Sequence, residues 1–120
     1  MLEPPQPAAP AQPEGVALGN LSVDFATYRV WIDEDYVALG NREFALLSLF
    51  CSSPDQILPY NVLTAAAFKA TGGRTLRHLN VVIHRLRAKL SRSYPYVIHT
   101  VRNRGYGLVH ARGLHPAPNH

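Results

Sequence analysis

Residues 76–91 read LRHLNVVIHRLRAKLS, and residues 96–109 read YVIHTVRNRGYGLV. In the first stretch, large apolar residues recur every three or four positions and would share one side of an α-helix. These residues are Leu79, Ile83, Leu86 and Leu90. The second stretch holds two β-rich runs around Arg102-Asn103-Arg104-Gly105, whose Asn and Gly tolerate the positive φ of a tight turn. The sequence therefore predicts a helix over about 76–91, with Thr75 as its cap, and a β-hairpin over about 96–109.

Upstream of this helix, the sequence predicts a small antiparallel sheet and two further helices. Apolar and polar residues alternate over about 21–25, 30–32 and 37–39, which favours three to four short strands. A first helix begins after Gly40, is capped by Glu43 and ends at Ser52-Ser53-Pro54. A second helix has Pro59 in its first turn and stops at 71–73. The expected apolar faces are Phe44, Leu47, Phe50 and Cys51 in the first helix, and Val62, Leu63, Ala66 and Ala67 in the second.

The order of strands, three helices and hairpin defines an α+β fold class. This order of elements predicts a winged helix-turn-helix with an N-terminal antiparallel sheet and a C-terminal β-hairpin wing. We expect the domain to span residues 16–112. Residues 1–15 hold five of the ten prolines and predict a disordered linker or tail, and residues 113–120 predict a second disordered tail.

Length and composition exclude several functions. A chain of 120 residues and 13.3 kDa has room for one small domain. No apolar stretch is long enough to span a membrane, so we expect a cytoplasmic protein without membrane contact. Cys51 is expected to be a buried apolar residue, and Tyr28 and Trp31 are expected to pack within strands. His78 and His84 lack the spacing of metal ligands, and no nucleophile motif or phosphate loop occurs, so we expect no metal, no cofactor and no enzymatic activity.

The charge is divided unevenly along the chain. All eight acidic residues lie before position 56, beside only two of the twelve Lys and Arg residues. The other ten basic residues follow without a single carboxylate. A segment with charge of one sign creates a focused positive field and indicates a polyanion as the partner.

The polar side of the predicted third helix is suited to DNA. It consists of Arg77, Val81, His84, Arg85, Ala88 and Arg92. Arginine can donate two hydrogen bonds to guanine, and a small apolar side chain can contact a thymine methyl group, so this face can contact base edges in the major groove. Asn80, Arg87 and Lys89 flank the face, where phosphates would lie. Arg102 and Arg104 at the hairpin tip suit a narrow minor groove.

Residues 77–90 and 99–107 together resemble the OmpR/PhoB-type DNA-binding domain, through the runs RLRAKL and TVRNRGYGL. Residues 39–47 look like the first helix of that family, and residues 53–58 like the segment that follows it. The resemblance implies the effector domain of a bacterial two-component response regulator. Such a domain would bind direct-repeat sites in double-stranded DNA as a head-to-tail pair, with the third helix in the major groove.

The resemblance and the residue types together imply individual roles. Val81, His84 and Arg85 would contact bases, and Arg102 would enter the minor groove. The residues expected to contact the DNA backbone are Arg74, Arg77, His78, Asn80, Arg87, Lys89, Thr100 and Arg104. The loop over 69–76 corresponds to a segment that contacts RNA polymerase in activators of the family.

Two other functions compete with sequence-specific DNA binding. The basic face could dock an acidic protein partner, or it could coat nucleic acid without sequence preference. The family is typically fused to a receiver domain, which does not fit within 120 residues. We therefore expect either an excised effector domain, which we favour, or a regulator that stands alone.

Overall fold

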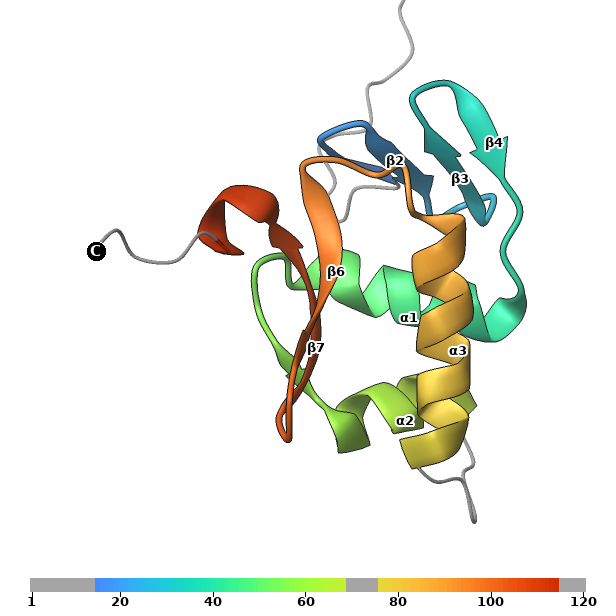
Figure 1. Ribbon diagram of the computed structural model, residues 1–120. Coiled ribbons are helices and arrows are strands. Elements are labelled where there is room, and N and C mark those ends of the chain that lie inside the picture. Colours follow the sequence, from blue (N-terminus) through green and yellow to red (C-terminus); the bar gives the residue numbers. More distant parts are fainter. Residues whose placement is uncertain (1–14, 69–75, 115–120) are drawn as a thin grey trace, which may run out of the picture.

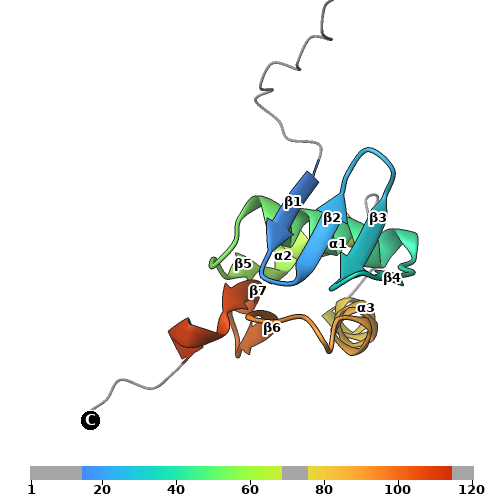
Figure 2. The same cartoon turned by 90° about the horizontal axis from the view of Figure 1, so that it is seen from above.

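The computed structural model describes residues 15–68 and 76–114 (Figure 1). Its elements are β1 (Gly15–Leu18), β2 (Leu21–Asp24), β3 (Arg29–Ile32), β4 (Asp35–Val37), α1 (Asn41–Ser52), β5 (Leu58–Pro59), α2 (Tyr60–Phe68), α3 (Leu76–Lys89), β6 (Tyr96–Val101), β7 (Gly105–His110) and the short 3-10 helix η1 (Ala111–Leu114). The N-terminal sheet lies at one end of the helices, and the β6–β7 hairpin lies beside α3 (Figures 1 and 2). This arrangement confirms the predicted winged helix-turn-helix fold.

The N-terminal sheet is antiparallel, with its strands in the order β1-β2-β3-β4. Alternation along β2 and β3 buries one side of the sheet, as is typical when the other side faces water. The buried side chains are Leu21, Val23, Val30 and Ile32. Strand β1 lies before the three predicted strand segments and pairs with β2 along its whole length. The sheet therefore has four strands, the upper end of the expected range.

Tyr28 does not lie in a strand, contrary to the prediction. It occupies the β2–β3 turn with a φ of 58° and is 72% exposed. The turn forms because Asp24 Oδ1 accepts hydrogen bonds from the backbone N–H groups of Ala26 and Thr27, which ends β2 before Tyr28 is reached. Trp31 does lie in β3, where its ring meets that of Tyr36 edge-on.

Helix α1 begins and ends as the sequence predicts. Glu43 caps it, because its Oε1 accepts a hydrogen bond of 2.8 Å from the Gly40 N–H. Its buried apolar residues are Leu46, Leu47, Phe50 and Cys51. Phe44, expected on this face, is only half-buried, because its ring packs against Phe25 and Tyr28 at the rim of the core.

Helix α2 departs from the predicted pattern in two respects. It begins at Tyr60, because Pro59 belongs to β5. Val62 is 39% exposed, whereas Leu63 and Ala67 are buried. Residues four positions apart share a helix face, but neighbouring residues lie about 100° apart, so Val62 is turned away from the side that Leu63 buries.

The predicted apolar face of α3 is confirmed. Leu79, Ile83, Leu86 and Leu90 are all buried, and Val82 joins them with 7% exposure. Because α3 meets both α1 and α2 through this face, its other face is left at the surface. The helix ends at Lys89, two residues before the predicted end. Thr75, the expected cap, lies outside the described residues.

Arg92 does not extend the polar face of α3, contrary to the prediction. The helix has already ended, and the Arg92 guanidinium bonds to Asp35 at 3.0 Å with Asp33 at 3.6 Å. Asn20 joins the same two regions, because its side chain donates to the Arg92 carbonyl at 3.0 Å and accepts from the Tyr94 N–H at 2.7 Å. The carboxyl end of α3 is thereby tied to the N-terminal sheet.

The wing is the antiparallel hairpin of β6 and β7, in which Tyr96 pairs with His110 and Val101 with Gly105. Asn103 takes the positive φ expected in the turn, at 65°. The short strand β5 was not predicted and pairs with β7, giving a sheet in the order β5-β7-β6. Two residues are too few for an alternation pattern to appear in the sequence.

The expected tails at 1–15 and 113–120 fall almost wholly outside the described residues. Gly113 and Leu114, which belong to the predicted C-terminal tail, form the end of η1. The described part of the chain thus continues two residues beyond the expected domain end.

Gly105→Ala should destabilise the domain by about 2 kcal/mol or more, because two constraints act at once. Gly105 has a φ of 158°, and a Cβ there would lie 1.8 Å from the Leu58 carbonyl oxygen. Gly113→Ala is the matched control, since a Cβ at Gly113 meets nothing within 4 Å. Urea unfolding of both variants would check this, and equal stability of the two would contradict the packing of β5 against β7.

Candidate nucleic-acid interface

The outer face of α3 carries the side chains predicted to contact bases. His84 and Arg85 are exposed, and Val81 is 44% exposed although it is apolar. Arg77 and Ala88 are exposed on the same helix. The helix lies at the front of the domain in Figure 1, and no other described element covers it. The predicted face is therefore available to a partner.

The tip of the wing presents two further cations. Arg102 and Arg104 are exposed on either side of Asn103, and the turn is closed by a hydrogen bond of 2.9 Å from the Arg104 N–H to the Val101 carbonyl. The hairpin runs beside α3, and its tip lies toward the amino end of the helix (Figure 1). Helix and wing thus offer positive charge on neighbouring elements of one side of the molecule.

Three residues predicted to contact the DNA backbone are bonded to the protein itself. The Arg87 guanidinium donates to the Ile98 carbonyl at 3.2 Å and to Thr100 Oγ1 at 2.7 Å. The Tyr106 hydroxyl donates to Asn80 Oδ1. The guanidinium of Arg87 also lies 6.0 Å from the centre of the Tyr106 ring, within range of a cation–π interaction. Asn80, Arg87 and Thr100 therefore connect α3 to the wing, and Tyr106 completes this connection.

The environment of Tyr106 explains how it holds the wing against α3. Its side chain is buried, and its ring meets that of Tyr60 edge-on at 5.9 Å. Burial raises the pKa of the Tyr106 hydroxyl above its usual range, Tyr60 adds to this rise, and Arg87 opposes it. The hydroxyl consequently stays protonated and remains a donor to Asn80 at neutral pH.

Lys89 is bonded to an acidic residue of the first helix. Its Nζ lies 2.7 Å from Glu43 Oε1, the same oxygen that caps α1 through Gly40. Glu43 is only 7% exposed. Burial raises the pKa of this carboxyl, but the hydrogen bonds from Lys89 and Gly40 and the charges of Lys89 and Arg85 together lower it below its ordinary value. The sequence predicted Glu43 only as a cap, and its bond to Lys89 of α3 was not predicted.

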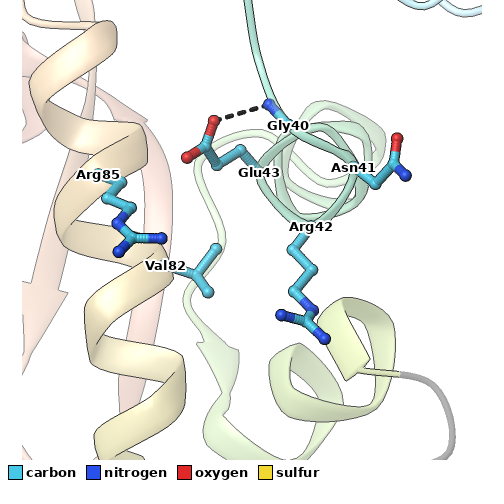
Figure 3. Close-up of a pocket in the computed structure, with 6 residues that line it drawn as sticks. All are labelled: Gly40, Asn41, Arg42, Glu43, Val82 and Arg85. Carbon is cyan, nitrogen blue, oxygen red and sulfur yellow. Dashed lines mark hydrogen bonds between the residues drawn. The ribbon is translucent and has the colours of Figure 1, made fainter.

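A pocket of about 380 Å³ opens between the start of α1 and the middle of α3 (Figure 3). It is lined by Gly40, Asn41, Arg42, Glu43, Val82 and Arg85. Arg85 of α3 and Glu43 of α1 both border this pocket, and the charge of Arg85 contributes to lowering the pKa of Glu43 (Figure 3). This pocket brings Arg42, from the acid-rich part of the sequence, close to α3.

Two further residues were predicted to contact the DNA backbone, His78 and Arg74. His78 is exposed near the start of α3, with its ring edge-on to Phe68. Arg74 and nearly all of the 69–76 loop lie outside the described residues.

In the part of the chain that the structure describes, no three His, Cys, Asp or Glu side chains gather as a metal site would require. None of the helices described is long and apolar enough to cross a bilayer.

Fold and surface together define a class of protein. A winged helix-turn-helix whose third helix and hairpin both expose arginine is built as a nucleic-acid-binding domain. Comparison with known proteins identifies the family. The sequence profile of the family described as "Transcriptional regulatory protein, C terminal" matches residues 33–108. The chain belongs to this family, as an effector domain of the OmpR/PhoB type, and the family is one of DNA-binding transcription regulators, not of enzymes.

Individual relatives agree with this assignment. The chain is 34% identical over 90 residues to the response regulator protein PmrA of Pseudomonas aeruginosa, covering 75% of this chain and 39% of that protein. It is 32% identical over 92 residues to the transcriptional activator protein IrlR of Burkholderia pseudomallei, covering 76% of this chain and 40% of that protein. The chain thus spans about two fifths of the length of these relatives.

A solved structure supports the fold in detail. The Klebsiella pneumoniae RstA DNA-binding domain, in complex with the RstA box, matches with a TM-score of 0.68 and 28% sequence identity. The match covers 80% of this chain and 97% of that one. Almost the whole of that DNA-binding domain therefore has a counterpart here.

Glu43→Gln should destabilise the domain by about 1 kcal/mol at neutral pH, less than a fully buried pair would cost, because Lys89 is partly exposed. The folded-state pKa of Glu43 is lowered, so its contribution is present above the ordinary value of 4.5 and is lost as the pH falls through the folded-state pKa. Urea unfolding from neutral to acidic pH should show the wild type and variant converging. If the difference in unfolding free energy between wild type and variant stays constant with pH, the ionised Glu43 carboxylate does not stabilise the fold through Lys89.

Cys51 should not react with a thiol reagent while the domain is folded. It is 6% exposed, and burial raises its pKa to about 12, so almost no thiolate exists at neutral pH. The prediction that it is a buried apolar residue is confirmed. Labelling with an aromatic disulfide at mildly alkaline pH, with and without denaturant, would test its reactivity. Fast labelling of the folded chain would contradict its burial.

Proposed function

We propose that this domain binds specific sites in double-stranded DNA and thereby regulates transcription. In this proposal α3 lies in the major groove, where Val81, His84 and Arg85 contact base edges. Arg102 enters the adjoining minor groove from the wing. The observation that carries the proposal is that these side chains are exposed on two neighbouring elements, while the apolar face of α3 is fully used by the core.

The proposed backbone contacts fall into two groups. Arg77 and Arg104 are exposed and would contact phosphates directly, as would Arg74, which lies outside the described residues. His78 is exposed as well and would contact a phosphate while its ring stays edge-on to Phe68. Thr100 would contact a phosphate with its hydroxyl hydrogen, because its oxygen already accepts a hydrogen bond from Arg87. Asn80, Arg87 and Lys89 would act less directly, since each already has a partner within the protein.

We extend the proposal to the whole regulator on the strength of the family. The relatives PmrA and IrlR bear the names of a response regulator and a transcriptional activator, and RstA was solved with its DNA box. By analogy, this domain would follow a receiver domain in a two-component regulator that acts on the bacterial chromosome, hence in the cytoplasm. It would occupy direct repeats as a head-to-tail pair, and its 69–76 loop would contact RNA polymerase.

Selection from random duplexes at physiological salt is the most direct test. We expect enrichment of a site with repeated half-sites, bound about 10³-fold or more tightly than random DNA. If about five phosphates are neutralised, log K should fall against log[salt] with a slope near −4.5. A steep slope without enrichment would instead support a nonspecific coating function, and the absence of duplex binding would favour an acidic protein partner.

Arg85→Ala and Arg104→Ala should weaken binding in different ways. Arg85→Ala should cost about 1–3 kcal/mol on the selected site and relax discrimination at one base pair, because a base contact is lost. Arg104→Ala should weaken selected and random duplexes alike and reduce the salt slope by about 1, because a phosphate contact is lost. Titrations of both variants on both duplexes would check this. Equal losses on the two duplexes for Arg85→Ala would overturn its assignment to a base.

A further inference from the structure

We propose that Arg42 at the start of α1 forms a third DNA contact, with a phosphate on the side of the major groove opposite to the wing. This inference rests on the proposed function. The wing and the start of α1 lie on opposite sides of α3, both from the front (Figure 1) and from above (Figure 2). When a helix occupies the major groove, a sugar-phosphate backbone borders it on each side. The wing lies at one border, and Arg42 lies toward the other.

Arg42 lies next to α3, the helix proposed to contact bases. Arg42 is exposed and lines the same pocket as Val82 and Arg85 of α3 (Figure 3). Its guanidinium carbon lies 4.9 Å from the centre of the Phe68 ring. A cation–π contact of this kind restricts the side chain while leaving its N–H groups able to donate. Arg42 is therefore a partly ordered donor at the edge of the proposed interface.

The charge of Arg42 is unfavourable for the isolated domain. It lies in the first turn of α1, where the helix dipole disfavours a cation. Within residues 15–68 and 76–114, no carboxylate lies within ion-pair distance of it, and the nearby Glu43 bonds to Lys89 instead. A DNA phosphate would supply the missing negative charge and accept the planar guanidinium through two hydrogen bonds.

The test compares Arg42→Ala with Arg29→Ala in the full 120-residue chain. Both changes remove one positive charge, but Arg29 begins β3 in the N-terminal sheet and does not line the pocket that Arg42 shares with α3. The probes are a duplex selected by the wild type and a random duplex of equal length. We expect Arg42→Ala to weaken binding to both duplexes about threefold to tenfold and to lower the salt slope by about 0.9, and we expect Arg29→Ala to change neither. Arg42→Lys should keep the salt slope, because the charge remains, but recover only part of the affinity, because an ammonium cannot make the two parallel hydrogen bonds of a guanidinium.

Thermal unfolding separates a lost contact from a lost fold. Because the dipole disfavours Arg42, Arg42→Ala should leave the Tm unchanged or raise it. If Arg42→Ala binds both duplexes like Arg29→Ala, the inference is wrong while the proposed function stands. If the wild type itself shows no salt-dependent duplex binding, the proposed function fails and the inference fails with it.

Methylphosphonate substitution locates the contact on the DNA. Neutralising single phosphates in the selected duplex removes one charge at a time. One phosphate on the border away from the wing should weaken wild-type binding when neutralised but have little effect on Arg42→Ala. If every neutralised phosphate weakens both proteins equally, Arg42 does not contact the backbone.

Discussion

The burial of one face of α3 is the constraint on which the rest of the structure depends. Leu79, Ile83 and Leu86 are each at most 1% exposed, so the helix cannot rotate about its axis without exposing large apolar side chains to water. Exposing one such side chain costs about 1.5–3 kcal/mol. The orientation of the polar face is therefore set from inside the domain, before any partner binds.

Three sets of polar contacts then fix α3 along its length. Asn80 and Arg87 bond to the wing, Lys89 bonds to Glu43 of α1, and Arg92 bonds to the N-terminal sheet just beyond the helix. Each contact involves a charged or polar residue that sequence alone would assign to the surface. In this domain basic residues thus have two tasks: some hold the helix in place, and others are left for a partner. The sequence does not distinguish these two groups of basic residues, whereas the contacts in the folded domain do.

The sequence predicted the architecture well, because its strongest signals are periodic. The apolar spacing in α3 and the Asn103-Arg104-Gly105 turn of the wing are local patterns whose geometry follows from neighbouring residues, and both were confirmed. Errors arose where geometry depends on distant residues. Strand β5 exists only because β7 supplies its partner, and Arg92 is drawn away from α3 by two carboxylates far off in sequence. The bond between Glu43 and Lys89 was missed for the same reason, because the two residues lie 46 positions apart in the sequence. A cation in the first turn of a helix was a local signal that could have drawn attention to Arg42, whose DNA contact is proposed.

The Gly19–Asn20 turn has a consequence for mechanical transmission through the domain. Gly19 has a φ of 63°, and a Cβ there would lie 2.3 Å from Pro95, so this turn is pressed directly against the segment that follows α3. Since the turn joins β1 to β2, a displacement of the edge strand would have to move the Tyr94–Pro95 segment that follows α3. A neighbouring domain attached ahead of β1 could in this way influence the position of α3 without having to touch it.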